Sequence, residues 1–190
     1  MQYVLIIISA VLVNNIVLAQ FLGICPFLGV SKKLSTAIGM GGAVLFVMTL
    51  STIVTYLIQN YVLVPLKIDF MQTVVYILVI AALVQMVELV LKKASPALYQ
   101  ALGVFLPLIT TNCAILGVAI LVIRKDYNLM ESTVFAIANA IGFTLALVVF
   151  STIRERLELL DIPEAMKGIP ISLVVAGLLA LAFMGFANIV

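Results

Sequence analysis

Six apolar runs, each about as long as a membrane-spanning helix, dominate this sequence of 190 residues. A helix needs about 20 apolar residues to cross roughly 30 Å of hydrocarbon. Hydrophobic residues make up 65% of the chain and charged ones only 9%, against roughly 25% charged in a soluble domain. The sequence therefore predicts an all-α integral membrane protein of six transmembrane helices. The runs are approximately residues 3–28, 36–60, 72–91, 99–123, 131–153 and 170–189.

Short charged connections separate the runs, so residues 1–190 should form a single membrane domain surrounded by lipid. Because cytoplasmic loops are enriched in Lys and Arg, the odd-numbered loops should face the cytoplasm and both termini should lie outside. The small net charge of +2 argues against a nucleic-acid partner. Loops one, three and five hold Lys32, Lys33, Lys92, Lys93, Arg154, Arg156 and Lys167, whereas loops two and four hold Lys67, Arg124 and Lys125.

Local signals mark several helix boundaries. Ser95-Pro96 suits an N-cap followed by proline at the first helical position of the fourth segment. Asn128, with Glu131 three residues later, resembles a capping box that opens the fifth segment. Ile162-Pro163 should break the helix that continues out of that segment.

One motif, Cys-x-x-Leu-Gly-Val, occurs twice, starting at Cys25 and at Cys113. The two copies are separated by close to half the chain, and each half holds three apolar runs. An odd number of crossings per repeat makes the second copy enter the membrane from the opposite side. The motif therefore predicts two inverted three-helix repeats, approximately residues 1–93 and 94–190.

Both copies of the motif lie where a helix should be interrupted. Gly23 and Pro26 surround the first cysteine, and the stretch Pro107-Leu108-Ile109-Thr110-Thr111-Asn112 precedes the second. Interrupted helices survive in a bilayer where protein buries them or where they line a cavity, and such places are usually functional. We expect interrupted helices 1 and 4, with the two cysteines facing one another near the midplane.

The chemistry of the two cysteines stays open at this point. Buried thiols often serve only packing, and one disulfide is also conceivable. Thiolate ligation of a metal or an iron–sulfur cluster accounts equally well for exposed backbone around the cysteines. Since a cluster usually takes four thiolates and the chain has no histidine, a second chain would have to supply the missing ligands. Candidates for a supporting shell around the ligands or for an ion path are Gly23, Pro26, Thr110, Thr111 and Asn112.

Several longer motifs extend over essentially the whole chain. They are Asn14-Asn15, Phe21-Leu22-Gly23-Ile24-Cys25-Pro26-Phe27, Gly29-Val30-Ser31-Lys32-Lys33, Leu106 through Ala114, Ile153-Arg154-Glu155-Arg156, Ala176-Gly177-Leu178 and Phe183-Met184-Gly185-Phe186. Together these motifs resemble the A subunit of the Rnf complex. The homologous E subunit of the sodium-pumping NADH:quinone oxidoreductase is similar in the same places, but the motifs around Asn14 and Cys25 are closer to the Rnf version.

The resemblance implies a subunit of an ion-translocating ferredoxin:NAD oxidoreductase in a prokaryotic cytoplasmic (inner) membrane. It implies that Cys25 and Cys113 hold half of a [2Fe–2S] cluster, which is shared with the paralogous E subunit and relays electrons across the membrane. The other implied partners are the D, G, C and B subunits, and the coupling ion is Na⁺ or H⁺. This chain alone should have no catalytic site and should bind no flavin or NAD.

Two other classes of function remain as alternatives. An autonomous secondary transporter would bind a solute at the broken helices and would need neither a partner nor a redox signal. A purely structural scaffold for redox partners would tolerate substitution of both cysteines.

Overall fold

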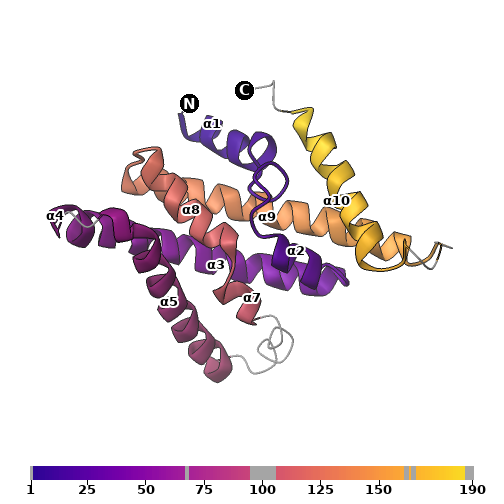
Figure 1. Ribbon diagram of the computed structural model, residues 1–190, viewed down its shortest axis with the longest axis horizontal. Helices are drawn as coiled ribbons and strands as arrows, with labels where there is room; N and C mark the ends of the chain where they lie inside the picture. The colour runs from indigo at the N-terminus through magenta and orange to yellow at the C-terminus, as the bar shows by residue number, and fades with distance from the viewer. Residues whose placement is uncertain (1, 67–68, 95–105, 161–162, 164–165, 187–190) are drawn as a thin grey trace.

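A computed structural model of the chain describes residues 2–66, 69–94, 106–160, 163 and 166–186. These residues form an all-helical bundle with no strand among them, in agreement with the predicted class (Figure 1). The α-helices are α1 Gln2–Ile8, α2 Ile24–Val30, α3 Leu34–Ile58, α4 Val64–Leu66, α5 Gln72–Ala94, α7 Leu106–Thr110, α8 Cys113–Arg124, α9 Leu129–Leu157 and α10 Ile169–Met184. Two π-helical turns, η1 Ser9–Val13 and η2 Gln59–Leu63, and a 3₁₀ turn, η3 Asp69–Met71, complete the described elements.

Within the described ranges, four helical stretches are long and apolar enough to cross a membrane, judged by length and composition. They correspond to the second, third, fourth and fifth predicted runs. The first and last runs correspond to shorter apolar helices, Tyr3–Val13 and Ile169–Met184. Large apolar side chains on α5 and α10 are exposed, as expected for surfaces that face lipid or other subunits. The four stretches are Leu34–Leu63, Gln72–Val90, Pro107–Arg124 and Leu129–Leu157.

The first and fourth apolar runs are each interrupted in the structure. In the first, helical backbone ends at Val13 and resumes at Ile24, so the break precedes Cys25 rather than surrounding it. Pro26 lies in the first turn of α2, where its missing N–H has no intrahelical partner to lose. In the fourth, Thr111 and Asn112 separate α7 from α8. The predicted cap at Ser95-Pro96 lies outside the described residues.

Helices α3 and α9 form the centre of the bundle and share its most extensive helix contact. They run antiparallel, because Leu34 at the start of α3 contacts Glu155 near the end of α9, whereas Gly41 meets Thr144 further along. A Cβ at Gly41 would collide with the Thr144 side chain, so glycine permits this close approach. The interrupted first and fourth apolar runs pack against this central pair.

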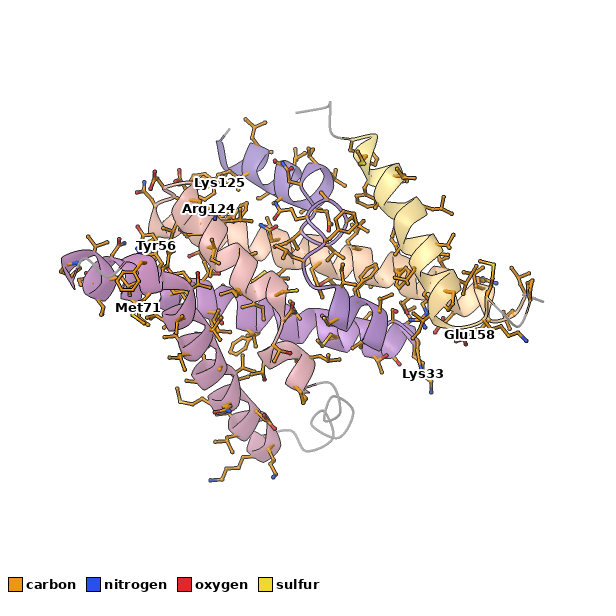
Figure 2. All side chains as sticks on the ribbon, viewed as in Figure 1. Lys33, Tyr56, Met71, Arg124, Lys125 and Glu158 are labelled. Atoms are coloured by element: carbon orange, nitrogen blue, oxygen red, sulfur yellow. The ribbon has the colours of Figure 1, made fainter. Side chains whose placement is uncertain are left out.

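The loops next to the α3–α9 pair lie at two opposite ends of the molecule, as expected for helices that cross a membrane in alternating directions. Figure 2 shows Lys33 and Glu158 at one end of the molecule and Met71, Arg124 and Lys125 at the opposite end. The capping box at the start of α9 is confirmed, with both reciprocal bonds between Asn128 and Glu131 present. Helix α9 ends at Leu157, ahead of Pro163, and Ile162 lies outside the described residues.

Candidate functional site

The first helix break is stabilised by Asn15, whose side chain is completely buried. Its Oδ1 accepts hydrogen bonds from the backbone N–H groups of Val17 (3.1 Å) and Leu18 (3.4 Å). Its Nδ2 donates to the carbonyls of Val11 (3.1 Å) and, on α9, Gly142 (2.9 Å). Asn15 therefore satisfies backbone groups that the break would leave unpaired in an apolar interior and ties the break to α9.

Gly23 closes the first break in a conformation that only glycine adopts readily. Its φ of +83° lies in the left-handed region. A Cβ at this position would lie 2.9 Å from Cε2 of Phe143 and 3.1 Å from Cβ of Ala114. The backbone N–H of Gly23 donates to Sγ of Cys113 at 2.9 Å, so backbone from the first break contacts the cysteine of the second.

The second break is a short N-cap structure. Asn112 is 3% exposed, and its Oδ1 accepts a hydrogen bond from the N–H of Ala114 at 3.0 Å, which caps α8. The exposed Thr111 donates its hydroxyl to the carbonyl of Pro107 at 2.9 Å, and Thr110 is half-buried at the end of α7. The amide nitrogen of Asn112 is buried and has no hydrogen-bond partner among the described residues.

The two cysteines differ in environment. Cys25 is exposed in the first turn of α2, and Cys113 is partly buried at the first position of α8. Both thiols are free, so the conceivable disulfide is not formed. Cys25 lies two residues after Gly23, whose N–H reaches the Cys113 sulfur. The structure thus brings the two cysteine-bearing segments together, with one sulfur at the protein surface.

The repeated motif makes reciprocal contacts across the site. A Cβ at Gly29, in the first copy, would lie 3.3 Å from Cδ1 of Leu108, which precedes the second break. A Cβ at Gly117, in the second copy, would lie 2.6 Å from Cδ1 of Leu22, which belongs to the first break. Each copy therefore uses its glycine to admit a leucine from the other half of the chain.

Two neighbouring charged residues of α9, Arg154 and Glu155, bind the end of α2 and the start of α3, respectively. Arg154, 8% exposed, donates from Nη1 to the carbonyl of Leu28 (2.9 Å) and to the hydroxyl of Ser31 (2.8 Å). Glu155 accepts the N–H of Leu34 at 3.1 Å through Oε1, at the start of α3. The cation meets the C-terminal end of α2 and the anion the N-terminal end of α3, as helix dipoles favour. The Phe27 ring stacks on Phe150 with centroids 4.3 Å apart, which seats α2 on α9.

Sequence reasoning identified Gly23, the cysteines and Asn112 but gave no role to Asn15 or Arg154. Asn15 was detectable as part of an amide pair inside an apolar run. Arg154 was detectable only as a member of a charged loop. Asn139, which lies in a small-residue segment of α9, donates to the Phe135 carbonyl at 2.8 Å, consistent with a packing role.

The donor set fits one half of an iron–sulfur site. Two thiols are available, one of them already accepting a backbone N–H, as cluster-ligating sulfurs commonly do. The buried amide nitrogen of Asn112, the residue before Cys113, has no acceptor among the described residues. No group of three or more His, Cys, Asp or Glu side chains capable of holding a metal occurs within the described ranges. A four-thiolate group would therefore need two ligands from another chain.

Comparison with known proteins identifies the family of the chain. The family model described as "Rnf-Nqr subunit, membrane protein" matches residues 3–190. The chain is 61% identical over 186 residues to the A subunit of the ion-translocating oxidoreductase complex of Syntrophotalea carbinolica, covering 98% of this chain and 96% of that protein. It is 57% identical over 188 residues to the A subunit of the Na(+)-translocating ferredoxin:NAD(+) oxidoreductase complex of Acetobacterium woodii, covering 99% of this chain and 98% of that protein.

A third relative, the A subunit of the ion-translocating oxidoreductase complex of Vibrio cholerae, is 53% identical over 189 residues, covering all of this chain and 98% of that protein. The resemblance to this type of subunit that the sequence motifs indicated is thereby confirmed. The family and the apolar helices together make this a multi-pass membrane protein and a subunit of an oxidoreductase complex. The chain belongs to the Rnf-Nqr family of membrane subunits.

Proposed function

We propose that this chain is the A subunit of an ion-translocating ferredoxin:NAD oxidoreductase of the Rnf type. In this proposal it supplies two of the four thiolates of a [2Fe–2S] cluster that it shares with a paralogous subunit. Electrons cross the membrane through this site, and their passage is coupled to movement of Na⁺ or H⁺. The names carried by the relatives from Syntrophotalea carbinolica and Acetobacterium woodii support the assignment to such a complex.

The observation that carries the proposal is the hydrogen bond from the Gly23 N–H to Sγ of Cys113. It joins the two helix breaks at a sulfur, where backbone N–H groups stabilise the negative charge of a ligating thiolate. Cys25, exposed on the adjacent segment, is free to meet ligands from a second chain. When bound, the [2Fe–2S] group supplies one-electron transfer; the residues of this chain hold it, orient it and exclude water from one side.

We further infer six membrane crossings arranged as inverted repeats, with both termini outside the cytoplasm. The reciprocal Gly29–Leu108 and Gly117–Leu22 contacts support the repeat, since each motif plays the same role toward the other half. The antiparallel α3–α9 pair and the loops at opposite ends of the bundle support alternating crossings (Figure 2). The bias of basic residues toward loops one, three and five supports the orientation.

The test is electron paramagnetic resonance of the dithionite-reduced complex, purified anaerobically with all its subunits. The proposal expects a [2Fe–2S] signal that disappears in both Cys25→Ser and Cys113→Ser. Ala119→Ser is the matched control, because it adds the same hydroxyl to a buried position of α8 without removing a sulfur. A fully assembled complex whose signal survives both cysteine substitutions would return the cysteines to packing and favour an autonomous transporter or a scaffold.

A further inference from the structure

The amide of Asn112 has one half in use and the other half without a partner. Its Oδ1 caps α8 by accepting the Ala114 N–H, which fixes the orientation of the amide because the nitrogen could not accept that bond. Its Nδ2 is buried and bonds to nothing among the described residues. Leaving a buried amide donor unpaired costs about 1–3 kcal/mol, so an acceptor brought within its reach when the site is loaded would stabilise the protein.

The place of this amide narrows the kind of acceptor. Oδ1 of Asn112 lies 3.4 Å from the position of a Cβ on Gly23, the residue whose N–H donates to the Cys113 sulfur. The side-chain amide of Asn112 is therefore close to Gly23, whose backbone N–H donates to the sulfur of Cys113. Two other buried polar atoms without partners occur in the described part of the chain, Ser51 Oγ in α3 and Ser151 Oγ in α9, and neither belongs to a helix break.

The chemistry of the amide defines the kind of partner it can take. Its oxygen accepts the capping hydrogen bond, whereas its nitrogen can only donate. The free half of the amide is a donor and suits an electron-rich partner. Sulfur carrying negative charge is such a partner at a site built around two cysteines.

We propose that Nδ2 of Asn112 donates a hydrogen bond to a sulfur of the iron–sulfur group held by Cys25 and Cys113, and so tunes its redox potential. The inference rests on the proposed function. Addition of one electron places a further negative charge on the group and breaks no bond. A donor to its sulfur stabilises this more negative, reduced form and raises the midpoint potential. The nitrogen of Asn112 thus stabilises the reduced form of the group, whereas its oxygen caps α8.

The direct test uses the assembled complex, grown with asparagine labelled with ¹⁵N only in the side-chain amide. Pulsed electron paramagnetic resonance of the reduced cluster should detect a ¹⁵N coupling. The coupling should be lost in Asn112→Ser, in which serine keeps a capping oxygen but has no amide. Asn139→Ser is the control, because Asn139 is an equally buried asparagine whose nitrogen is already satisfied by the Phe135 carbonyl.

A redox titration of the same samples gives an independent reading. The Asn112→Ser complex should have a lower midpoint potential, with the reduced-to-oxidised ratio at fixed ambient potential falling about tenfold, or about 59 mV for one electron. The control for altering an N-cap is Asn128→Ser, which makes the same change at the exposed N-cap of α9. If the Asn112→Ser complex does not assemble, Asn112→Asp is the second variant, because it preserves the shape and the capping oxygen. It has no amide nitrogen, so the ¹⁵N coupling should be lost in this variant as well.

The outcomes separate the two proposals. A wild-type [2Fe–2S] signal that depends on Cys113 but shows no ¹⁵N coupling overturns the role of Asn112 and leaves the proposed function standing. A coupling that survives in Asn112→Ser arises from another asparagine and overturns it equally. Absence of any cluster signal from the assembled wild-type complex overturns the proposed function, and the role of Asn112 with it.

Discussion

The backbone N–H of Gly23 donates to Sγ of Cys113 at 2.9 Å, across a sequence separation of 90 residues. This one bond joins the end of the first helix break to the first residue after the second. It forms because Gly23 adopts a φ of +83° against the ring of Phe143, where no side chain could be accommodated. The position of the sulfur therefore depends on a residue that carries no functional group.

Substitution of Gly23 by alanine should damage the site through two effects. The left-handed conformation costs an L-residue roughly 1–2 kcal/mol, and the new Cβ would lie 2.9 Å from Phe143 and 3.1 Å from Ala114. We expect a lower melting temperature of the purified complex and loss of most of the proposed [2Fe–2S] signal. Thermal melting and the size of that paramagnetic resonance signal per complex are the measurements.

A control for Gly23→Ala separates strain from collision. Gly168 has a similar φ of +92°, but nothing lies within 4 Å of a Cβ built there. Gly168→Ala should also lower the melting temperature, because a φ of +92° with a ψ of −120° strains any residue that has a Cβ, but it should leave the [2Fe–2S] signal unchanged. Equal loss of that signal in the two variants would show that crowding against Phe143 does not position the Cys113 sulfur.

The adjacent asparagines of the first break should respond very differently to truncation. Asn15 is buried and makes four hydrogen bonds, including one to the Gly142 carbonyl on α9, whereas the exposed Asn14 makes one side-chain bond, to Ser9 at 3.3 Å. With each lost buried bond worth about 1 kcal/mol, Asn15→Ala should destabilise the protein by about 2–4 kcal/mol. Asn14→Ala should change stability by less than about 0.5 kcal/mol.

The measurement for this pair is thermal unfolding of the chain within its complex, compared at equal detergent and lipid content. The exposed neighbour serves as the control, since it differs by one position and has the same chemistry. Similar melting temperatures for the two variants would contradict a stabilising role for Asn15 at the break.

The fold was predictable where it depends on local properties of the chain. The four long helices follow from apolar runs of sufficient length, and the capping box at Asn128 and Glu131 follows from residues three apart. The existence of both interruptions was also predictable, because Gly23, Pro107 and the polar residues before Cys113 disfavour continuous helix. The exact place of the first break was not: it begins at Asn14, where Asn15 offers backbone groups an alternative partner.

The parts of the site that depend on distant contacts could not be predicted. Asn15 bonds to Gly142 across 127 positions and Arg154 to Leu28 across 126, and no local pattern in either segment encodes its partner. The role of Asn112 was only half predicted. The sequence placed it beside Cys113, but only the structure shows that its oxygen caps α8 and that its nitrogen has no hydrogen-bond partner among the described residues.

Arg154 should be essential for stability, whereas its neighbour Arg156 should not. Arg154→Met keeps most of the apolar stem but leaves the Leu28 carbonyl and the Ser31 hydroxyl without their charged donor. Hydrogen bonds to charged groups contribute about 1.5–3 kcal/mol each, so the melting temperature should fall clearly. Arg156 is exposed, and Arg156→Met should leave the melting temperature almost unchanged. A fall of the melting temperature by the same amount in both variants would point to net charge at this end of α9 rather than to the buried contacts.

The final prediction concerns coupling between electron flow and ion movement, for which Cys25 is the sharpest probe. Cys25 is exposed and takes no part in the hydrogen bond by which Asn112 caps α8, so Cys25→Ser should leave α8 and its cap intact. If ions move only when electrons pass the site, this variant, reconstituted in vesicles, should lose ferredoxin-dependent NAD reduction and ion uptake together. Both activities are measured on the same vesicles, with Ser35→Ala as a control that removes an exposed hydroxyl near the start of α3. Ion uptake that persists without electron transfer would show that the broken helices conduct ions independently of the cysteines, as an autonomous transporter would.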